Sequence, residues 1–88
     1  MGYKQLEVIC KGVASHRRVQ TLVILARTPH LSLNDIAHKL NTNFRTASEH
    51  IRRMVAAGLV EKRQAGRSVQ HSLSRRGKNI LSFLGKLE

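Results

Sequence analysis

Acidic, aromatic and cysteine residues are all scarce in this chain, and the scarcity excludes several classes of function. With five Asp and Glu residues among 88, acid–base catalysis has little material, and no phosphate-binding loop or nucleophile motif is present, so we expect no enzyme activity. The single cysteine, Cys10, excludes an internal disulfide and a cysteine metal cluster. No apolar run approaches the roughly 18 residues of a membrane-spanning helix, and no signal peptide is visible.

The same composition sets the size and the setting of the fold. A chain of this length forms one domain with one modest core. Aromatic residues are limited to Tyr3, Phe44 and Phe83, so Leu, Ile, Val and Ala must fill that core. Cys10 fits a reducing intracellular compartment, the cytoplasm or the nucleoid, and is itself expected to be a small buried residue.

Positive charge, in contrast, is abundant. Sixteen Lys and Arg residues give a formal net charge of +11. Residues 45–76 hold Arg45, Arg52, Arg53, Lys62, Arg63, Arg67, Arg75 and Arg76 against only Glu49 and Glu61. A solvated surface is one interpretation, but a charge so strongly of one sign favours a polyanionic partner such as nucleic acid.

Apolar spacing predicts two helices in the first third of the chain. One runs from Leu6 to Val13, with Gly12 loosening its end, and the other from Val19 to Ala26. Ser15 is the expected N-cap of the second helix, which is expected to be the buried centre of the fold. Thr28-Pro29 ends it, because the residue before proline avoids the helical region.

The segment from Leu33 to Val60 has the pattern of two short helices joined by a polar turn. Ser32 and Asp35 form a capping box before the first, whose Ile36, Ala37 and Leu40 face inward. The turn is Asn41-Thr42-Asn43, and Asn43 is the expected N-cap of the second helix. Ala47, Ile51 and Met54 share one face of that helix, and Arg45, Glu49 and Arg52 lie opposite. Such an exposed face suits the major groove of DNA.

A β-hairpin and a last helix are expected after Gly58. The strands lie near residues 60–64 and 68–73, with the turn at 65–67. Val69, His71 and Leu73 alternate with polar residues and are expected to face the core. Ser74 caps a helix whose apolar stripe contains Ile80, Leu84 and Leu87.

Three motifs in this order resemble the ArsR-type repressors. ASHRRVQTLVIL is similar to their first core helix, and NTNFRTASEHIRRMVAAGLVEKR to their recognition helix and its exit. LSRRGKNIL is similar to the helix after the wing in ArsR-like and MarR-like regulators. The resemblance covers residues 13–84 and implies a dimeric DNA-binding transcription regulator. The implied fold is a winged helix-turn-helix, mainly α with a small β-hairpin, with five helices and a two- or three-stranded wing.

We therefore expect residues 1–88 to form a single winged helix-turn-helix domain. Its third and fourth helices lie at about 32–58 and its wing at about 59–73, and the terminal helices serve dimerisation. Metal-sensing relatives place a cysteine pair where this chain has Ser32 and Asn34, so cysteine-based metal sensing is not implied. The five histidines form no metal motif, and no metal or cofactor is expected, although a site assembled across a dimer is an alternative. No effector can be named.

The expected DNA contacts combine the exposed face of helix 44–58, which would enter the major groove, with the basic wing 61–72. Arginine can hold guanine or a phosphate through two bonds at once. Glu49 would accept from cytosine or, by its spacing, pair with neighbouring arginines. Wing cations could instead only protect an edge strand from aggregation. The full expected set is Asn43, Arg45, Thr46, Ser48, Glu49, Arg52, Arg53, Lys62, Arg63 and Arg67.

Three further positions carry narrower expectations. Phe44 is expected to pack against the third helix rather than meet a base, and His50 to be partly buried. Arg18 matches an arginine of the ArsR family, which implies a structural role or a contact with the DNA backbone.

Apolar stripes on the first and last helices predict a homodimer, because a four-segment core would not cover them. The two helices could instead pack on each other within one chain. Two other functions compete with the dimeric regulator, namely a nonspecific DNA- or chromatin-associated protein and a winged-helix module that binds proteins. The expected dimer interface is Leu6, Ile9, Ile80, Phe83, Leu84 and Leu87.

Overall fold

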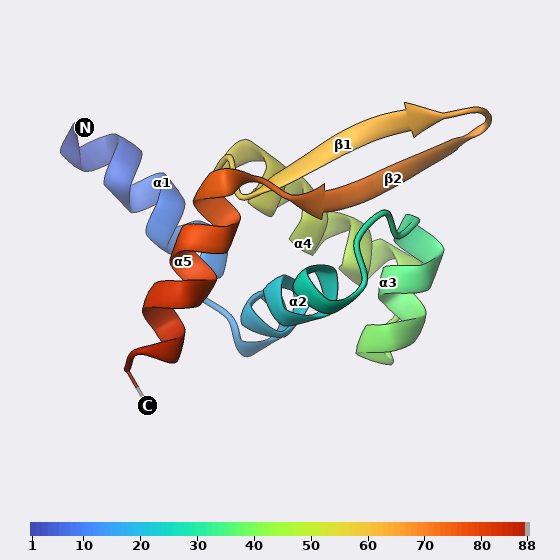
Figure 1. Ribbon diagram of the computed structural model, residues 1–88, viewed down its shortest axis with the longest axis horizontal. Helices are drawn as coiled ribbons and strands as arrows, with labels where there is room; N and C mark the ends of the chain where they lie inside the picture. Colours follow the sequence, from blue (N-terminus) through green and yellow to red (C-terminus); the bar gives the residue numbers. More distant parts are fainter. Residues whose placement is uncertain (88) are drawn as a thin grey trace.

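Residues 1–87, which this computed structural model describes, form five helices and one antiparallel hairpin in the predicted order (Figure 1). Residue 88, the last position of the expected domain, lies outside the described residues. The predicted fold class is confirmed. The elements are α1 (Tyr3–Val13), α2 (His16–Arg27), α3 (Leu33–Leu40), α4 (Phe44–Ala56), β1 (Val60–Ala65), β2 (Ser68–Leu73) and α5 (Arg75–Gly85).

Four of the five helices begin at the predicted N-caps, whereas α1 begins at Tyr3, three residues before the expected Leu6. The side chains of the four expected N-caps each accept a hydrogen bond from the backbone N–H three residues on, and the capping box at α3 is complete. Local hydrogen bonding therefore fixes these helix starts. At the other end of α4, Gly58 has a φ of +74°, which favours glycine and turns the chain into β1. The four N-caps that fix the helix starts are Ser15 for α2, Ser32 for α3, Asn43 for α4 and Ser74 for α5.

The core lies around α2, which contacts every other helix and β2. Leu22 and Leu25 of α2 are buried against Ile36 and Leu40 of α3 and Met54 of α4. The expected inward faces of α3 and α4 are confirmed. In α2 the apolar stripe was expected to include Leu25 and Ala26, and of these Leu25 is buried whereas Ala26 is exposed.

The first helix is rotated relative to the prediction. Ile9 and Gly12 are buried, whereas Cys10 is exposed, so the expectation of a buried thiol was wrong. α1 ends at Val13, one residue after Gly12. This rotation places the smallest residue of α1 against the end of α4, so that the two helices approach closely.

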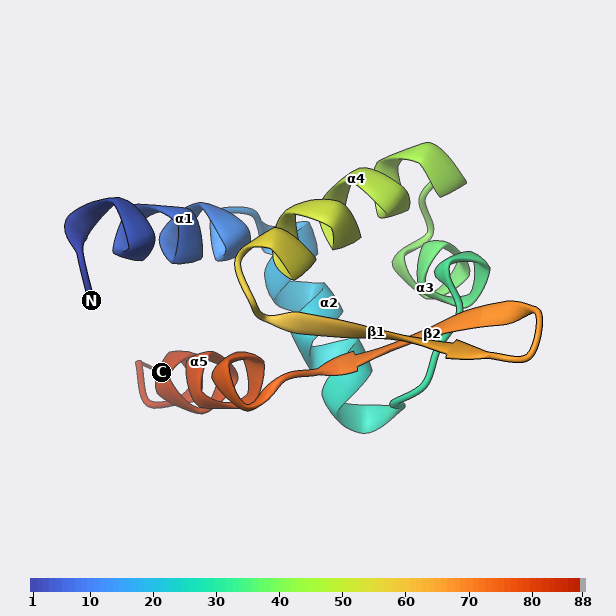
Figure 2. The same ribbon diagram turned by 90° about the horizontal axis from the view of Figure 1, so that it is seen from above.

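The hairpin reaches from the core toward solvent. Its register pairs Val60 with Leu73 at the base and Ala65 with Ser68 beside the turn. His71 is buried at a bridge to Leu31, whose carbonyl accepts from the His71 N–H at 2.8 Å, so a third strand is reduced to one residue pair. Val69 is 38% exposed, against expectation, because it lines an open groove with Asn34 and Phe44 and does not enter the core. Figure 2 shows the hairpin running past α3 so that its tip extends beyond the helices.

Candidate nucleic-acid interface

The outer face of α4 presents charged side chains to solvent. Arg45, Glu49, Arg52 and Arg53 are exposed, opposite the buried face of the same helix. The first turn of α4 is held by the amide oxygen of Asn43, which accepts from the Thr46 N–H at 2.7 Å. This arrangement makes the cationic face a rigid part of the fold.

An ion-pair network organises this face. Glu49 accepts a hydrogen bond from Arg52, and its carboxylate lies 3.6 Å from Nε of Arg53. The hydrogen bond from Arg52, with the positive charges of Arg52, Arg53 and Arg45, lowers the pKa of Glu49 below 4.5. The predicted pairing of Glu49 with its neighbours is therefore confirmed, and one acid restrains two arginines.

His50 lies on the inner side of this charged surface. It is partly buried, as predicted, and shares a hollow of about 350 Å³ with Arg45, Thr46 and Glu49. Burial lowers the pKa of His50 below 6.5, and the positive charges of Arg18 and Arg17 add to the effect. The lowered pKa favours the neutral form of the imidazole.

A groove of about 450 Å³ joins the hairpin to the helix pair. Lys62 and Arg67 of the hairpin line it together with Asn34 of α3 and Phe44 of α4. Phe44 is 53% exposed, so the expectation that it packs against α3 was wrong. The start of α3, the start of α4 and the basic hairpin therefore line the same groove. Arg63, the third expected wing cation, is exposed but does not line this groove.

The expected dimer residues divide into two groups. Leu6 and Leu87 are exposed, and Phe83 is 58% exposed, whereas Ile80 and Leu84 are partly buried against the core. Ile9 is only 8% exposed and belongs to the core cluster of the single chain.

Figures 1 and 2 both place α1 and α5 at the end of the molecule opposite the hairpin tip. Tyr3 and Val8 add exposed apolar surface on α1 that the sequence reasoning missed, because it followed only the stripe from Leu6. An apolar surface therefore exists at this end even though Ile9 contributes little to it.

Among residues 1–87, no helix has the length and apolar character needed to cross a membrane. The same part of the chain holds no group of three or more His, Cys, Asp or Glu residues placed to bind a metal ion.

The family assignment comes from comparison with known proteins. The model of the MarR family matches residues 15–68, which is more than half of the chain and includes α2, α3, α4 and most of the hairpin. This chain belongs to the MarR family. No curated protein matches it.

Solved structures share the fold of this MarR-family chain. One is the homodimeric winged helix-turn-helix DNA-binding domain of a possible ArsR-family transcriptional regulator from Mycobacterium bovis, with 25% identity, 96% of this chain and 78% of that chain covered, and a TM-score of 0.86. HlyU from Vibrio cholerae has 27% identity, 99% and 97% coverage and a TM-score of 0.81. The transcriptional regulator HlyU from Vibrio vulnificus has 28% identity, 96% and 88% coverage and a TM-score of 0.76. The expected resemblance to ArsR-like and MarR-like regulators is confirmed.

Proposed function

We propose that this chain is a transcription regulator that binds double-stranded DNA as a homodimer. The observation that carries the proposal is the exposed cationic face of α4, a helix whose first residue, Phe44, lines a groove together with Lys62 and Arg67 of the basic hairpin. A helix with this face fits the major groove, and the hairpin would then follow the backbone or the minor groove. The similarity to a homodimeric DNA-binding domain from Mycobacterium bovis supports the same function.

Within α4 we assign different roles to different side chains. Arg45 and Arg52 reach base edges or phosphates, because guanidinium donates two bonds in a fixed geometry. Thr46 and Ser48 are short donors near the helix start and suit a phosphate or a thymine. Glu49 restrains Arg52, which reduces the conformational freedom lost on binding. The remaining proposed contacts are Asn43, Arg53, Lys62, Arg63 and Arg67.

The dimer is proposed to form through the apolar end of the molecule. Leu6 and Phe83 are its centre, because both are exposed large apolar residues on the terminal helices. A two-fold axis there would place two copies of α4 about one DNA turn apart, roughly 34 Å, over a near-palindrome. Residues 1–88 would then act as one DNA-binding domain with terminal helices for dimerisation, located in the cytoplasm or nucleoid and without enzyme activity.

Competition binding tests the proposal. Duplexes selected from a random pool are labelled and competed with random duplex at about 150 mM salt, where nonspecific affinity is weak. We expect the selected duplex to resist competition by at least about a thousandfold excess, the lower range for specific binding. Equal competition by random duplex would instead support a nonspecific DNA- or chromatin-associated protein. If no duplex binds even at about 50 mM salt, the protein-binding module replaces both.

A further inference from the structure

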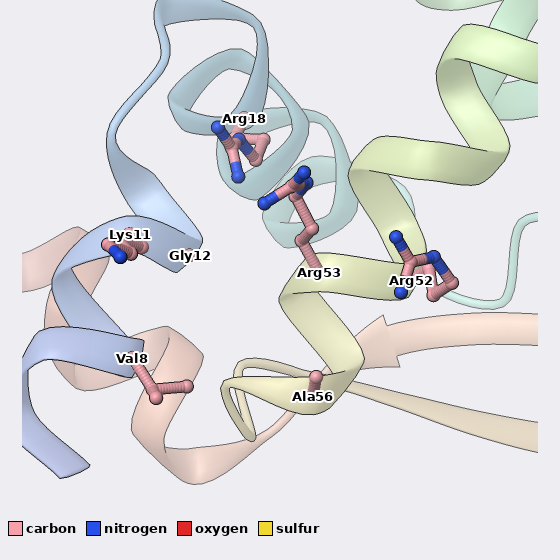
Figure 3. A pocket seen from close by; sticks show the side chains of 7 residues that line it. All are labelled: Val8, Lys11, Gly12, Arg18, Arg52, Arg53 and Ala56. Carbon is pink, nitrogen blue, oxygen red and sulfur yellow. The ribbon is translucent and has the colours of Figure 1, made fainter. Parts of the chain in front are cut away.

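A second basic feature adjoins the outer face of α4, with which it shares Arg52 and Arg53, and lies between α1, α2 and the last turns of α4. It is a cavity of about 270 Å³, here called the arginine cavity (Figure 3). Four of its lining side chains are cationic and none is acidic. This volume is several times the roughly 30 Å³ that one water molecule occupies, so a small ion with part of its hydration shell fits. The lining residues are Val8, Lys11, Gly12, Arg18, Arg52, Arg53 and Ala56.

Arg18 is the unusual member of the arginine cavity. Its Nε and Nη1 atoms are buried and have no hydrogen-bond partner among the described residues. A guanidinium is always charged, and a buried charge without a partner is costly, so native structures nearly always satisfy such atoms. No ion pair of residues 1–87 includes Arg18. The fold therefore holds a partly buried cation, with two buried guanidinium nitrogens, and supplies no counter-charge to it among the described residues.

The neighbouring cations increase this imbalance. Figure 3 shows the guanidinium of Arg53 extending from α4 toward that of Arg18 on α2, across the cavity that both line. Glu49 pairs with Arg52 and lies 3.6 Å from Arg53, and Glu7 lies 4.0 Å from Lys11, although both acids are exposed and neither lines the cavity. Arg18 is therefore the cation of this cavity that has no acidic partner among the described residues. Like charges converging on one cavity repel each other unless an anion lies between them.

We propose that the arginine cavity binds one phosphate-type oxyanion. Arg18 is the main donor, since charge-assisted bonds from guanidinium to an oxyanion are among the strongest hydrogen bonds in proteins. Lys11 and Arg53 supply further charge from α1 and α4, and Ala56 leaves room through its small side chain. A free phosphate group and a backbone phosphate of DNA share this chemistry. The free-phosphate case does not depend on the proposed DNA function.

Titration with inorganic phosphate tests the free-anion source. The full chain, labelled with ¹⁵N, is titrated in phosphate-free buffer with total ionic strength kept constant by sodium chloride. We expect saturable one-site shifts confined to the amides of residues 8–18 and 52–56. Arg18→Gln should weaken binding roughly 10- to 100-fold, the range for loss of a charge-assisted bond. Arg75→Gln, an exposed arginine outside the cavity, is the matched control and should leave affinity unchanged.

A second variant covers the case in which Arg18→Gln fails to fold. Arg53→Gln removes a cation whose side chain is 53% exposed, so it should keep the fold and still weaken phosphate binding severalfold. Shifts that never saturate, or that spread evenly over the basic surface, would mean general charge screening and would count against a free-anion site.

A DNA-binding experiment tests the second source, a backbone phosphate of a bound duplex. Each backbone phosphate of a bound duplex is replaced in turn by a neutral methylphosphonate. If the cavity holds a backbone phosphate, one replacement weakens wild-type binding and has no further effect in Arg18→Gln, as a double-mutant cycle requires for a direct contact. If phosphate binding does not saturate and no backbone position is coupled to Arg18, the proposal is overturned. Failure of DNA binding alone would contradict the proposed function but leave the titration of free phosphate decisive.

Discussion

Gly12 of α1 lies directly against Ala57 at the end of α4, and a Cβ atom on Gly12 would lie 2.6 Å from the Cβ of Ala57. The same added atom would lie 3.1 Å from the side chain of Leu59. Glycine is therefore required here for the close approach of two helices, not for an unusual backbone angle. The contact joins a terminal helix, where we place the dimer, to the helix that we propose reads DNA.

Gly12→Ala should destabilise the fold by about 1–3 kcal/mol, the usual cost of overpacking a well-packed contact. Denaturant unfolding followed by circular dichroism measures this free energy. Gly85→Ala is the matched control, because a Cβ at Gly85 meets nothing within 4 Å, and its effect should stay within about 0.5 kcal/mol. An equal free energy of unfolding for the two variants would show that α1 and α4 move apart to accommodate the added methyl group without a loss of stability.

Arg52→Ala should weaken binding to a selected duplex by about 1–3 kcal/mol, the range for losing one good base contact. Binding to random duplex should fall less, since one of many phosphate contacts is lost. Fluorescence anisotropy at fixed salt measures both affinities. Glu49→Gln frees Arg52 and removes a negative charge near phosphates, so it should strengthen random binding and reduce selectivity. Equal losses for both duplexes in Arg52→Ala would make Arg52 a phosphate contact.

Features that depend on interactions between residues close in sequence were predictable, and features that depend on contacts between distant segments were not. The N-caps at Ser32 and Asn43 were predictable, because each bond spans three residues. The rotation of α1 was not, since it depends on a contact between Gly12 and Ala57, 45 positions apart. An apolar stripe alone cannot show that Cys10 is exposed.

The candidate site divides in the same way. The pairing of Glu49 with Arg52 and Arg53 follows from helical spacing and was predicted. The unpaired guanidinium of Arg18 depends on how three helices meet. The exposure of Phe44 likewise depends on how far the hairpin lies from α3 and α4, which no local pattern encodes.

Phe83→Glu should convert the proposed dimer to a monomer, because it places a charge in an apolar interface. Its side chain is 58% exposed in the single chain, so the monomer should remain folded. Sedimentation equilibrium at micromolar concentration gives the mass of each species. Phe44→Glu is the matched control, an equally exposed phenylalanine beside the hairpin, and it should remain dimeric. A wild-type chain that is strictly monomeric under these conditions would refute the homodimer.

His50 should make the stability of the fold fall in mildly acidic solution. Its pKa in the folded chain lies below 6.5, because burial and the nearby Arg18 and Arg17 disfavour the charged imidazole. As pH falls below about 6.5, the unfolded chain takes up a proton that the folded chain does not, so the free energy of unfolding decreases until the folded pKa is reached. Above that range His50 is neutral in both states and contributes no pH dependence.

Denaturant unfolding between pH 5 and 8 measures this decrease, and His50→Gln should make the curve flatter below pH 6.5. His16→Gln removes an exposed histidine at the start of α2 and serves as the control for the loss of any imidazole. The direct measurement is a ring-proton NMR titration of His50, which should give a midpoint below 6.5. A midpoint at or above that value would contradict the lowered pKa of His50 and, with it, the predicted loss of stability.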